Sequence, residues 1–198
     1  MIKFAKALVK SLPVMLCIGV GAPGFSALVQ NPSNGQESIP AKSQSQVSFG
    51  ALKTLSGTWA GPVTTDPPNP GLEGIIQVTM RVASRGNVIV HEIAPGGIPE
   101  PTVIYLESDH LTLIHYCEAG NRPRLVARNS PNQKAVAFNF ADISGSTNPA
   151  YLHDFAFNMI DVDHHIEDWT FMLPGDKLLH AHFDLKRTNE SAASPTRK

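Results

Sequence analysis

A repeated alternation of apolar and polar residues runs through most of the chain and constrains its fold more than any other feature. Runs rich in Val, Ile, Thr and Phe are separated by turn residues, such as Ser84-Arg85-Gly86-Asn87 and Pro174-Gly175-Asp176. Such runs predict β-strands, and no amphipathic stretch of useful helical length lies between them. The expected strands cover residues 56–61, 72–83, 87–94, 102–107, 110–118, 124–128, 134–140, 153–160, 164–172 and 177–186.

The short connections between these strands predict a single closed sheet. Neighbours joined by tight turns are antiparallel, because a parallel pair needs a long crossover. A long antiparallel meander removes its exposed edges by closing. We therefore predict an all-β fold, a single closed antiparallel up-and-down β-barrel of about ten strands. A barrel of more than about eight strands is too wide for its own side chains to fill, so an interior ligand cavity is expected.

The first 27 residues differ in character from the rest. Lys3, Lys6 and Lys10 precede a short apolar run, residues 12–20, and small residues follow it. This is the pattern of a secretory signal peptide. The run is shorter than the roughly 20 apolar residues that a membrane span needs. We expect an exported protein, periplasmic or secreted, without a stable membrane span.

The domain organisation follows from shifts in composition along the chain. A segment rich in Gln, Asn, Ser and Pro comes after the signal peptide, and a polar segment ends the chain. Neither has the apolar content to order by itself. We expect a signal peptide at 1–27, a flexible linker at 28–48, the β-barrel at 49–187 and a polar tail at 188–198.

Composition also limits the partners. With 198 residues, of which 42% are hydrophobic and 17% charged, the chain suits one well-cored globular domain. Its formal net charge is -1 and it has no basic block, which argues against nucleic acid as a partner. Removal of the signal peptide would take Cys17 away and leave Cys117, so we expect no intramolecular disulfide.

The densest group of reactive and hydrogen-bonding side chains surrounds the turn at Ala119-Gly120-Asn121. His115 and Cys117 are two residues apart on a strand and share one face, whereas Tyr116 points to the other. A cysteine next to a histidine is one arrangement used in nucleophilic catalysis. A small buried cysteine is also a common core residue, and both interpretations remain open.

A second pair of histidines, His180 and His182, lies on one face of the last expected strand. Two such imidazoles chelate a divalent metal such as Zn²⁺ when a neighbouring strand supplies a third ligand. The opposite face of that strand carries an apolar set, Leu179, Ala181, Phe183 and Leu185. If that set is interior, the two histidines face solvent instead.

Further polar residues on the strands are candidates for an interior cluster with His115. Buried charge requires pairing, so such a cluster either stabilises the fold or orients a ligand. Trp59 and Trp169 are expected to fill the core. The candidate ligand-binding residues are His115, Tyr116, Cys117, Arg124, Glu92, His153, Glu167 and Trp169, and the candidate catalytic residues are His115, Glu92 and Cys117.

The segment Leu55-Ser-Gly-Thr-Trp-Ala-Gly61, entering a long meander, is similar to the calycin superfamily of lipocalins, fatty-acid-binding proteins and nitrobindins. Combined with His115-Tyr-Cys117, Gly120-Asn121, Pro123-Arg124 and Glu167-Asp-Trp169, it resembles a group of exported bacterial lipocalin-like domains without an assigned function. The resemblance covers about residues 52–186 and implies a barrel with an interior site. Among nitrobindins it also implies a haem held by one histidine. The chain departs from the nitrobindin pattern at Pro62-Val63-Thr64, where further glycines are expected, and none of its histidines is matched to the haem ligand.

Three hypotheses for the function follow. The first is a non-enzymatic binding protein that holds a small hydrophobic or amphipathic molecule, oriented by His115, Tyr116 or Arg124. The second is an isomerase or hydrolase in the same cavity, with His115 and Glu92 as acid and base. The third is a barrel that binds haem or a divalent metal. The first is favoured because the sequence holds no complete catalytic signature.

Overall fold

The structure is a computed structural model that describes residues 41–128, 134–147 and 149–188. The expected signal peptide, most of the expected linker and residues 189–198 of the expected tail lie outside the described residues. Within the part that is described, no helix combines the length and the hydrophobicity needed to cross a membrane.

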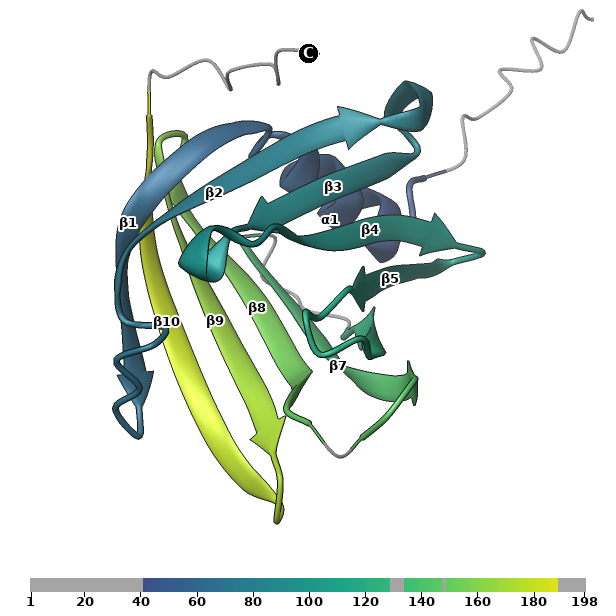
Figure 1. Cartoon of the computed structure of the whole chain (residues 1–198). Coiled ribbons are helices and arrows are strands. Elements are labelled where there is room, and N and C mark those ends of the chain that lie inside the picture. Colours follow the sequence, from purple (N-terminus) through teal and green to yellow (C-terminus); the bar gives the residue numbers. More distant parts are fainter. Residues whose placement is uncertain (1–40, 129–133, 148, 189–198) are drawn as a thin grey trace, which may run out of the picture. The chain divides into compact units, whose positions relative to one another are not determined.

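The described chain forms a closed barrel of ten antiparallel strands (Figure 1). Each strand pairs with the next one along the chain, and the last pairs with the first. The predicted closed up-and-down β-barrel is therefore confirmed. The strands are β1 (Gly57–Asp66), β2 (Gly74–Ala83), β3 (Val88–Ile93), β4 (Glu100–Glu107), β5 (His110–His115), β6 (Arg122–Ala127), β7 (Ala135–Ser144), β8 (Tyr151–Asp161), β9 (His164–Leu173) and β10 (Lys177–Arg187).

The helix α1 (Gln44–Lys53) precedes β1 and begins inside the segment that we expected to be a flexible linker. Ser43 and Gln46 form a reciprocal capping box, in which each side chain binds the other residue's backbone N–H. This cap satisfies two donors at the start of the helix and allows a helix to begin in a polar sequence. Phe49 and Leu52 are buried, and α1 contacts β4 and β5.

The two ends of the barrel differ. Because consecutive strands run in opposite directions, the β1–β2, β3–β4, β5–β6, β7–β8 and β9–β10 connections share one end, which we call the open end. The other end, which we call the closed end, is covered by α1. From there towards the middle, large aromatic side chains fill the interior, namely Trp59, Phe138, Phe155, Phe157 and Trp169. Both tryptophans are core residues, as predicted.

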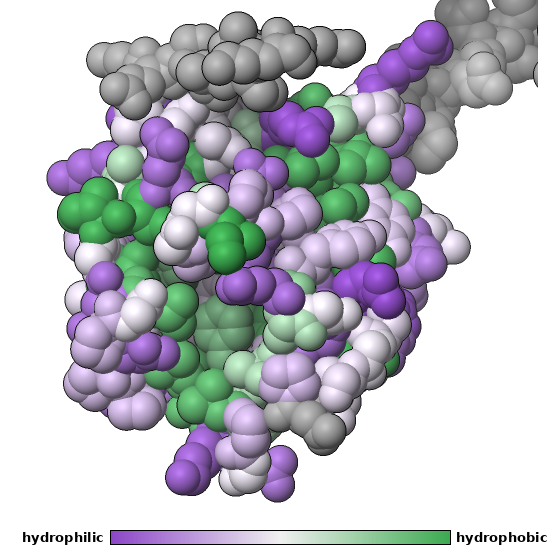
Figure 2. All heavy atoms as spheres, viewed as in Figure 1, coloured by the Kyte–Doolittle hydropathy of each residue, from purple (hydrophilic) through white to green (hydrophobic). Residues whose placement is uncertain are grey.

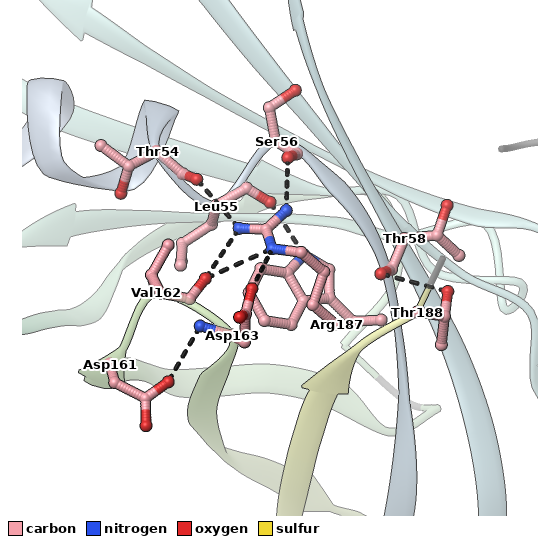
Figure 3. A network of polar contacts seen from close by, with 10 residues as sticks. Thr54, Leu55, Ser56, Thr58, Asp161, Val162, Asp163, Arg187 and Thr188 are labelled. Carbon is pink, nitrogen blue, oxygen red and sulfur yellow. Dashed lines mark hydrogen bonds and ion pairs between the residues drawn. The ribbon is translucent and has the colours of Figure 1, made fainter. Parts of the chain in front are cut away.

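Arg187, at the end of β10, ties several segments together at the closed end (Figure 3). Its guanidinium donates hydrogen bonds to the carbonyls of Ser56 (2.8 Å) and Val162 (3.0 Å) and to the carboxylate of Asp163 (3.1 Å). It also lies over the ring of Trp59, with the guanidinium carbon 4.1 Å from the ring centroid. One side chain thus joins the start of β1, the β8–β9 turn and the end of β10, where the barrel closes.

Candidate ligand-binding cavity

A cavity of about 510 Å³ lies at the open end. In the space-filling view, apolar atoms are recessed between more polar residues of the surrounding surface (Figure 2). Loops and strand ends around the open end form its wall, and most of the side chains are apolar. The apolar and small lining residues are Gly71, Leu72, Ile76, Ile93, Pro95, Gly96, Ile98, Ala119, Ala150, Phe171, Leu173, Leu179 and Phe183, and the polar ones are Asn69, Glu100, His115, Cys117 and Glu118.

His115 is the buried polar residue of this wall. It ends β5 and shares the interior face with Leu111 and Leu113, as the alternation predicts. Its Nδ1 lies 2.8 Å from the hydroxyl of Thr102 on the neighbouring strand, which fixes the plane of the ring. Its Nε2 is buried and has no hydrogen-bond partner within the described residues. A buried polar atom without a partner costs stability unless a ligand or water satisfies it.

Glu100, the first residue of β4, faces His115 across the cavity wall. One carboxylate oxygen, Oε2, lies 3.2 Å from Nε2 of His115, at ion-pair distance but misaligned for a hydrogen bond. The other, Oε1, accepts a hydrogen bond of 3.4 Å from the backbone N–H of Glu118. The Glu100 side chain is 16% exposed. An imidazole and a carboxylate therefore lie side by side in a cavity wall that is mostly apolar.

Cys117 also lines the cavity, and its thiol is free. Burial raises the pKa of the Cys117 thiol to about 11, against smaller opposing effects of hydrogen bonds to backbone groups. The thiol is therefore protonated at neutral pH, whereas nucleophilic catalysis requires the thiolate. This favours a packing role for Cys117 over the role of nucleophile.

Several predicted ligand-binding residues lie elsewhere. Tyr116 is 41% exposed and Glu92 projects from the outer face of β3, between the buried residues His91 and Ile93. The pairing of His115 with Glu92, expected as acid and base, does not occur, because these side chains lie on opposite faces of the wall. Glu100 takes the place of Glu92 next to the imidazole.

Arg124 and His153 have partners outside the cavity. The guanidinium of Arg124 forms an exposed ion pair with Asp142, which raises the pKa of Arg124 and lowers that of Asp142. His153 stacks on the ring of Phe140, with centroids 5.3 Å apart, and its Nδ1 lies 2.8 Å from the carboxylate of Asp154. Neither residue lines the cavity.

Glu167 and Trp169 belong to a buried network together with His91 and His165, which we call the Glu167 network. The carboxylate of Glu167 receives N–H groups from His91 (3.1 Å), from His165 (3.0 Å) and from the indole of Trp169 (3.1 Å). Burial would raise the pKa of Glu167, but the charge of His91 and the hydrogen bonds of the two histidines outweigh it and lower the pKa to about 2. The ring of Trp169 also contacts that of His115, with centroids 5.4 Å apart, so this network adjoins the cavity wall.

The structure does not favour a metal site at His180 and His182. Both lie on the outer face of β10, since Leu179, Ala181, Phe183 and Leu185 form its interior face. Their partners are the hydroxyl of Thr170 (3.0 Å) and the carboxylate of Asp168 (2.7 Å), respectively. Across the described residues, no group of three or more His, Cys, Asp or Glu side chains has an arrangement that could hold a metal ion.

A haem held by one histidine also fits these residues poorly. Such a group needs an imidazole nitrogen that faces a cavity without a competing partner. His115 is the histidine of the cavity wall, and the carboxylate of Glu100 stands 3.2 Å from the nitrogen that would bind iron. We therefore derive no chemistry through haem.

Sequence reasoning did not single out His91 or Glu100. His91 alternates with Glu92 in a strand whose two faces are both partly apolar, so the sequence does not show which face is interior. Glu100 lies between Pro99 and Pro101, in the connection between the expected strands 87–94 and 102–107. The signal for Glu100 was its spacing, because it shares a strand face with Thr102 and Ile104.

Comparison with known proteins supports the fold. No protein-family model and no curated protein matches the chain. The structure is similar to that of Rv2717c from M. tuberculosis, with a TM-score of 0.53 and 16% identity over 72% of this chain and 98% of the other. A protein of unknown function from the DUF3598 family of Nostoc punctiforme PCC 73102 gives a TM-score of 0.47 and 11% identity over 69% of this chain. This chain spans about half of that protein, 49% of its length.

The closed barrel of ten described strands, with its interior cavity, fits the class of lipocalin-like β-barrel proteins. The similarity to Rv2717c concerns the fold alone, given the identity of 16%.

Proposed function

We propose that this protein binds a small apolar or amphipathic molecule in the cavity at the open end, as a lipocalin-like member of the calycin superfamily. The observation that carries the proposal is a cavity of about 510 Å³ whose mostly apolar wall contains a buried histidine nitrogen without a hydrogen-bond partner in the described chain. Binding sites for small molecules have this volume and this composition, with a few polar groups that fix the orientation of the ligand.

The cavity residues take different parts in this function. The apolar side chains of the wall, such as Ile76, Phe171 and Phe183, would remove the apolar part of the ligand from water. His115 and Glu100 would orient its polar group, and Thr102 holds the imidazole in place for this purpose. Cys117 would contribute a small apolar surface.

A pair of neighbouring positions on β2 provides the test. Ile76 lines the cavity, whereas Ile75 is 79% exposed. Replacing Ile76 by Trp would fill part of the cavity, and we expect it to weaken the binding of Nile red, a neutral apolar dye, by about ten-fold or more. The measurement is a fluorescence titration, with thermal melting to show that the variant is folded.

Ile75→Trp is the matched control. It adds the same ring on the outer face and should change the dissociation constant by less than about two-fold. If the dye does not bind the natural protein, or if both tryptophan variants bind it as well as the natural protein, binding in the cavity is ruled out.

We also propose that the protein is exported. The three lysines, the short apolar run and the small residues of the first 27 positions support this proposal.

A further inference from the structure

We infer that the cavity selects ligands whose polar group is uncharged or cationic and donates a hydrogen bond, such as an alcohol or an amine, and that it disfavours carboxylates such as fatty acids. This inference rests on the proposed function and specifies the chemistry of the ligand in the same cavity.

The charged residues of the cavity wall are acidic and disfavour an anionic ligand. Glu100 and Glu118 both line the cavity, and among the described residues that line it there is no lysine or arginine. A ligand carboxylate would therefore meet two like charges and no fixed cation. Charges interact more strongly near a protein interior than in water, and an unpaired buried charge is costly. An ammonium group would instead gain from both carboxylates.

His115 does not reverse this balance. When its imidazole is neutral, it offers an anion at most one hydrogen bond from Nε2. When it is protonated, its charge faces the carboxylate of Glu100 at 3.2 Å, and the pair is close to neutral as a whole. In neither state does the cavity present a net positive charge to a ligand.

The hydrogen-bond donors and acceptors of Glu100 and His115 favour a ligand group that donates a hydrogen bond. An ionised carboxylate only accepts hydrogen bonds, and one oxygen of Glu100 already accepts the N–H of Glu118. The other oxygen, Oε2, lies 3.2 Å from Nε2 of His115, which has no hydrogen-bond partner among the described residues. A hydroxyl or an amine can donate to Oε2, and a hydroxyl can at the same time accept from Nε2. A ligand carboxylate has no proton to donate to Glu100.

The apolar side chains of the wall determine which apolar part of a ligand fits the cavity. Phe171, Leu179 and Phe183 contribute to the wall from β9 and β10, and Ile98 contributes to it from the β3–β4 connection. An alkyl chain fits such a wall, because its burial is not directional. Ligands with the same alkyl chain and different polar groups therefore isolate the selection that we infer.

The experiment is a competition against Nile red with 1-dodecanol, dodecylamine and dodecanoate at pH 8. There the acid is ionised and the amine protonated, since carboxyl groups titrate near 4 and alkylamines above about 10. We expect the alcohol and the amine to displace the dye about ten-fold more effectively than the acid does. The inference is overturned if dodecanoate competes as well as or better than dodecanol, or if the dye binds and none of the three displaces it. Absence of dye binding would overturn the proposed function itself.

Two variants test the role of Glu100. Glu100→Gln keeps the shape of the side chain and removes its charge, so the ratio of amine to acid affinity should fall by about ten-fold. Glu107→Gln makes the same change at the other end of β4, where the side chain is 55% exposed, and should leave the ratio unchanged. If Glu100→Gln does not fold, Glu118→Gln should move the ratio in the same direction by a smaller factor. If the ratio of amine to acid affinity is unchanged in Glu100→Gln, or in Glu118→Gln where Glu100→Gln does not fold, the inference is overturned.

Discussion

Glu167 is a fully buried carboxylate in the interior of a β-barrel, and its three N–H donors explain how the fold tolerates it. A buried charge is tolerated when it is paired and its lone pairs are used. His91 and His165 use their Nε2 atoms for this purpose, while their Nδ1 atoms are buried without a hydrogen-bond partner in the described residues. The network therefore depends on the carboxylate as its common acceptor.

Glu167→Gln should destabilise the barrel by about 2–4 kcal/mol. The amide has only one acceptor oxygen, and its NH₂ group would face an imidazole N–H group. Urea denaturation measures the effect. Asp168→Asn is the control. Asp168 follows Glu167 in β9, but its side chain lies on the outer face and is 49% exposed. Its substitution should lower the unfolding free energy by less than about 1 kcal/mol.

The same residue predicts a dependence on pH. The pKa of Glu167 is lowered from 4.5 to about 2, so its contribution to stability is complete above pH 4.5 and is lost as the pH falls towards 2. The difference in unfolding free energy between the natural protein and Glu167→Gln should therefore shrink over this range. Parallel stability curves for the two proteins would contradict the role given to Glu167.

The candidate site was partly predictable from single residues. His115 and Cys117 were placed together because period-two alternation is local, and the structure has both in the cavity wall. Arg124 and Glu92 were candidates because they are polar residues in strands, and both project outward. The orientation of a strand relative to the interior depends on its pairing with distant strands, which one sequence does not show.

At the scale of elements, the strands were more predictable than the helix. Turn residues such as Pro174-Gly175-Asp176 mark strand ends locally, and β9 and β10 end and begin close to the expected positions. Strand β1 continues to Asp66, five residues past its expected end, because its long pairing with β10 includes residues beyond Pro62. The start of helix α1, residues 44–48, was assigned to the flexible linker, because its cap uses ordinary Ser and Gln residues.

Arg187→Ala should destabilise the barrel by about 2–4 kcal/mol, because it removes several hydrogen bonds to carbonyl groups and the contact with the Trp59 ring. The effect should be visible as a lower midpoint in urea and a lower melting temperature. The neighbouring Lys186 is exposed, and Lys186→Ala should change the unfolding free energy by less than about 0.5 kcal/mol. Equal effects of the two substitutions would show that Arg187 does not hold the closed end.

At the scale of the whole molecule, the proposed export leads to a test in living cells. We expect the chain of residues 1–198, expressed in a bacterium, to be recovered from the periplasm or the medium and to be cleaved near residue 27. Mass spectrometry of the purified protein gives the site of cleavage. A chain that begins at residue 28 is the control and should stay in the cytoplasm. An uncleaved, cytoplasmic product of the chain that begins at residue 1 would refute export.

If the cavity binds a ligand as proposed, the alternation of connections between the two ends allows recognition and folding to change independently. The Arg187 contacts and α1 lie at the end opposite the loops around the cavity entrance. Substitutions or insertions in the β1–β2, β3–β4 and β5–β6 loops can therefore remodel that entrance while the structural anchor stays unchanged. Such a barrel is suited to acquiring new specificities by loop exchange, both in natural divergence and in engineering.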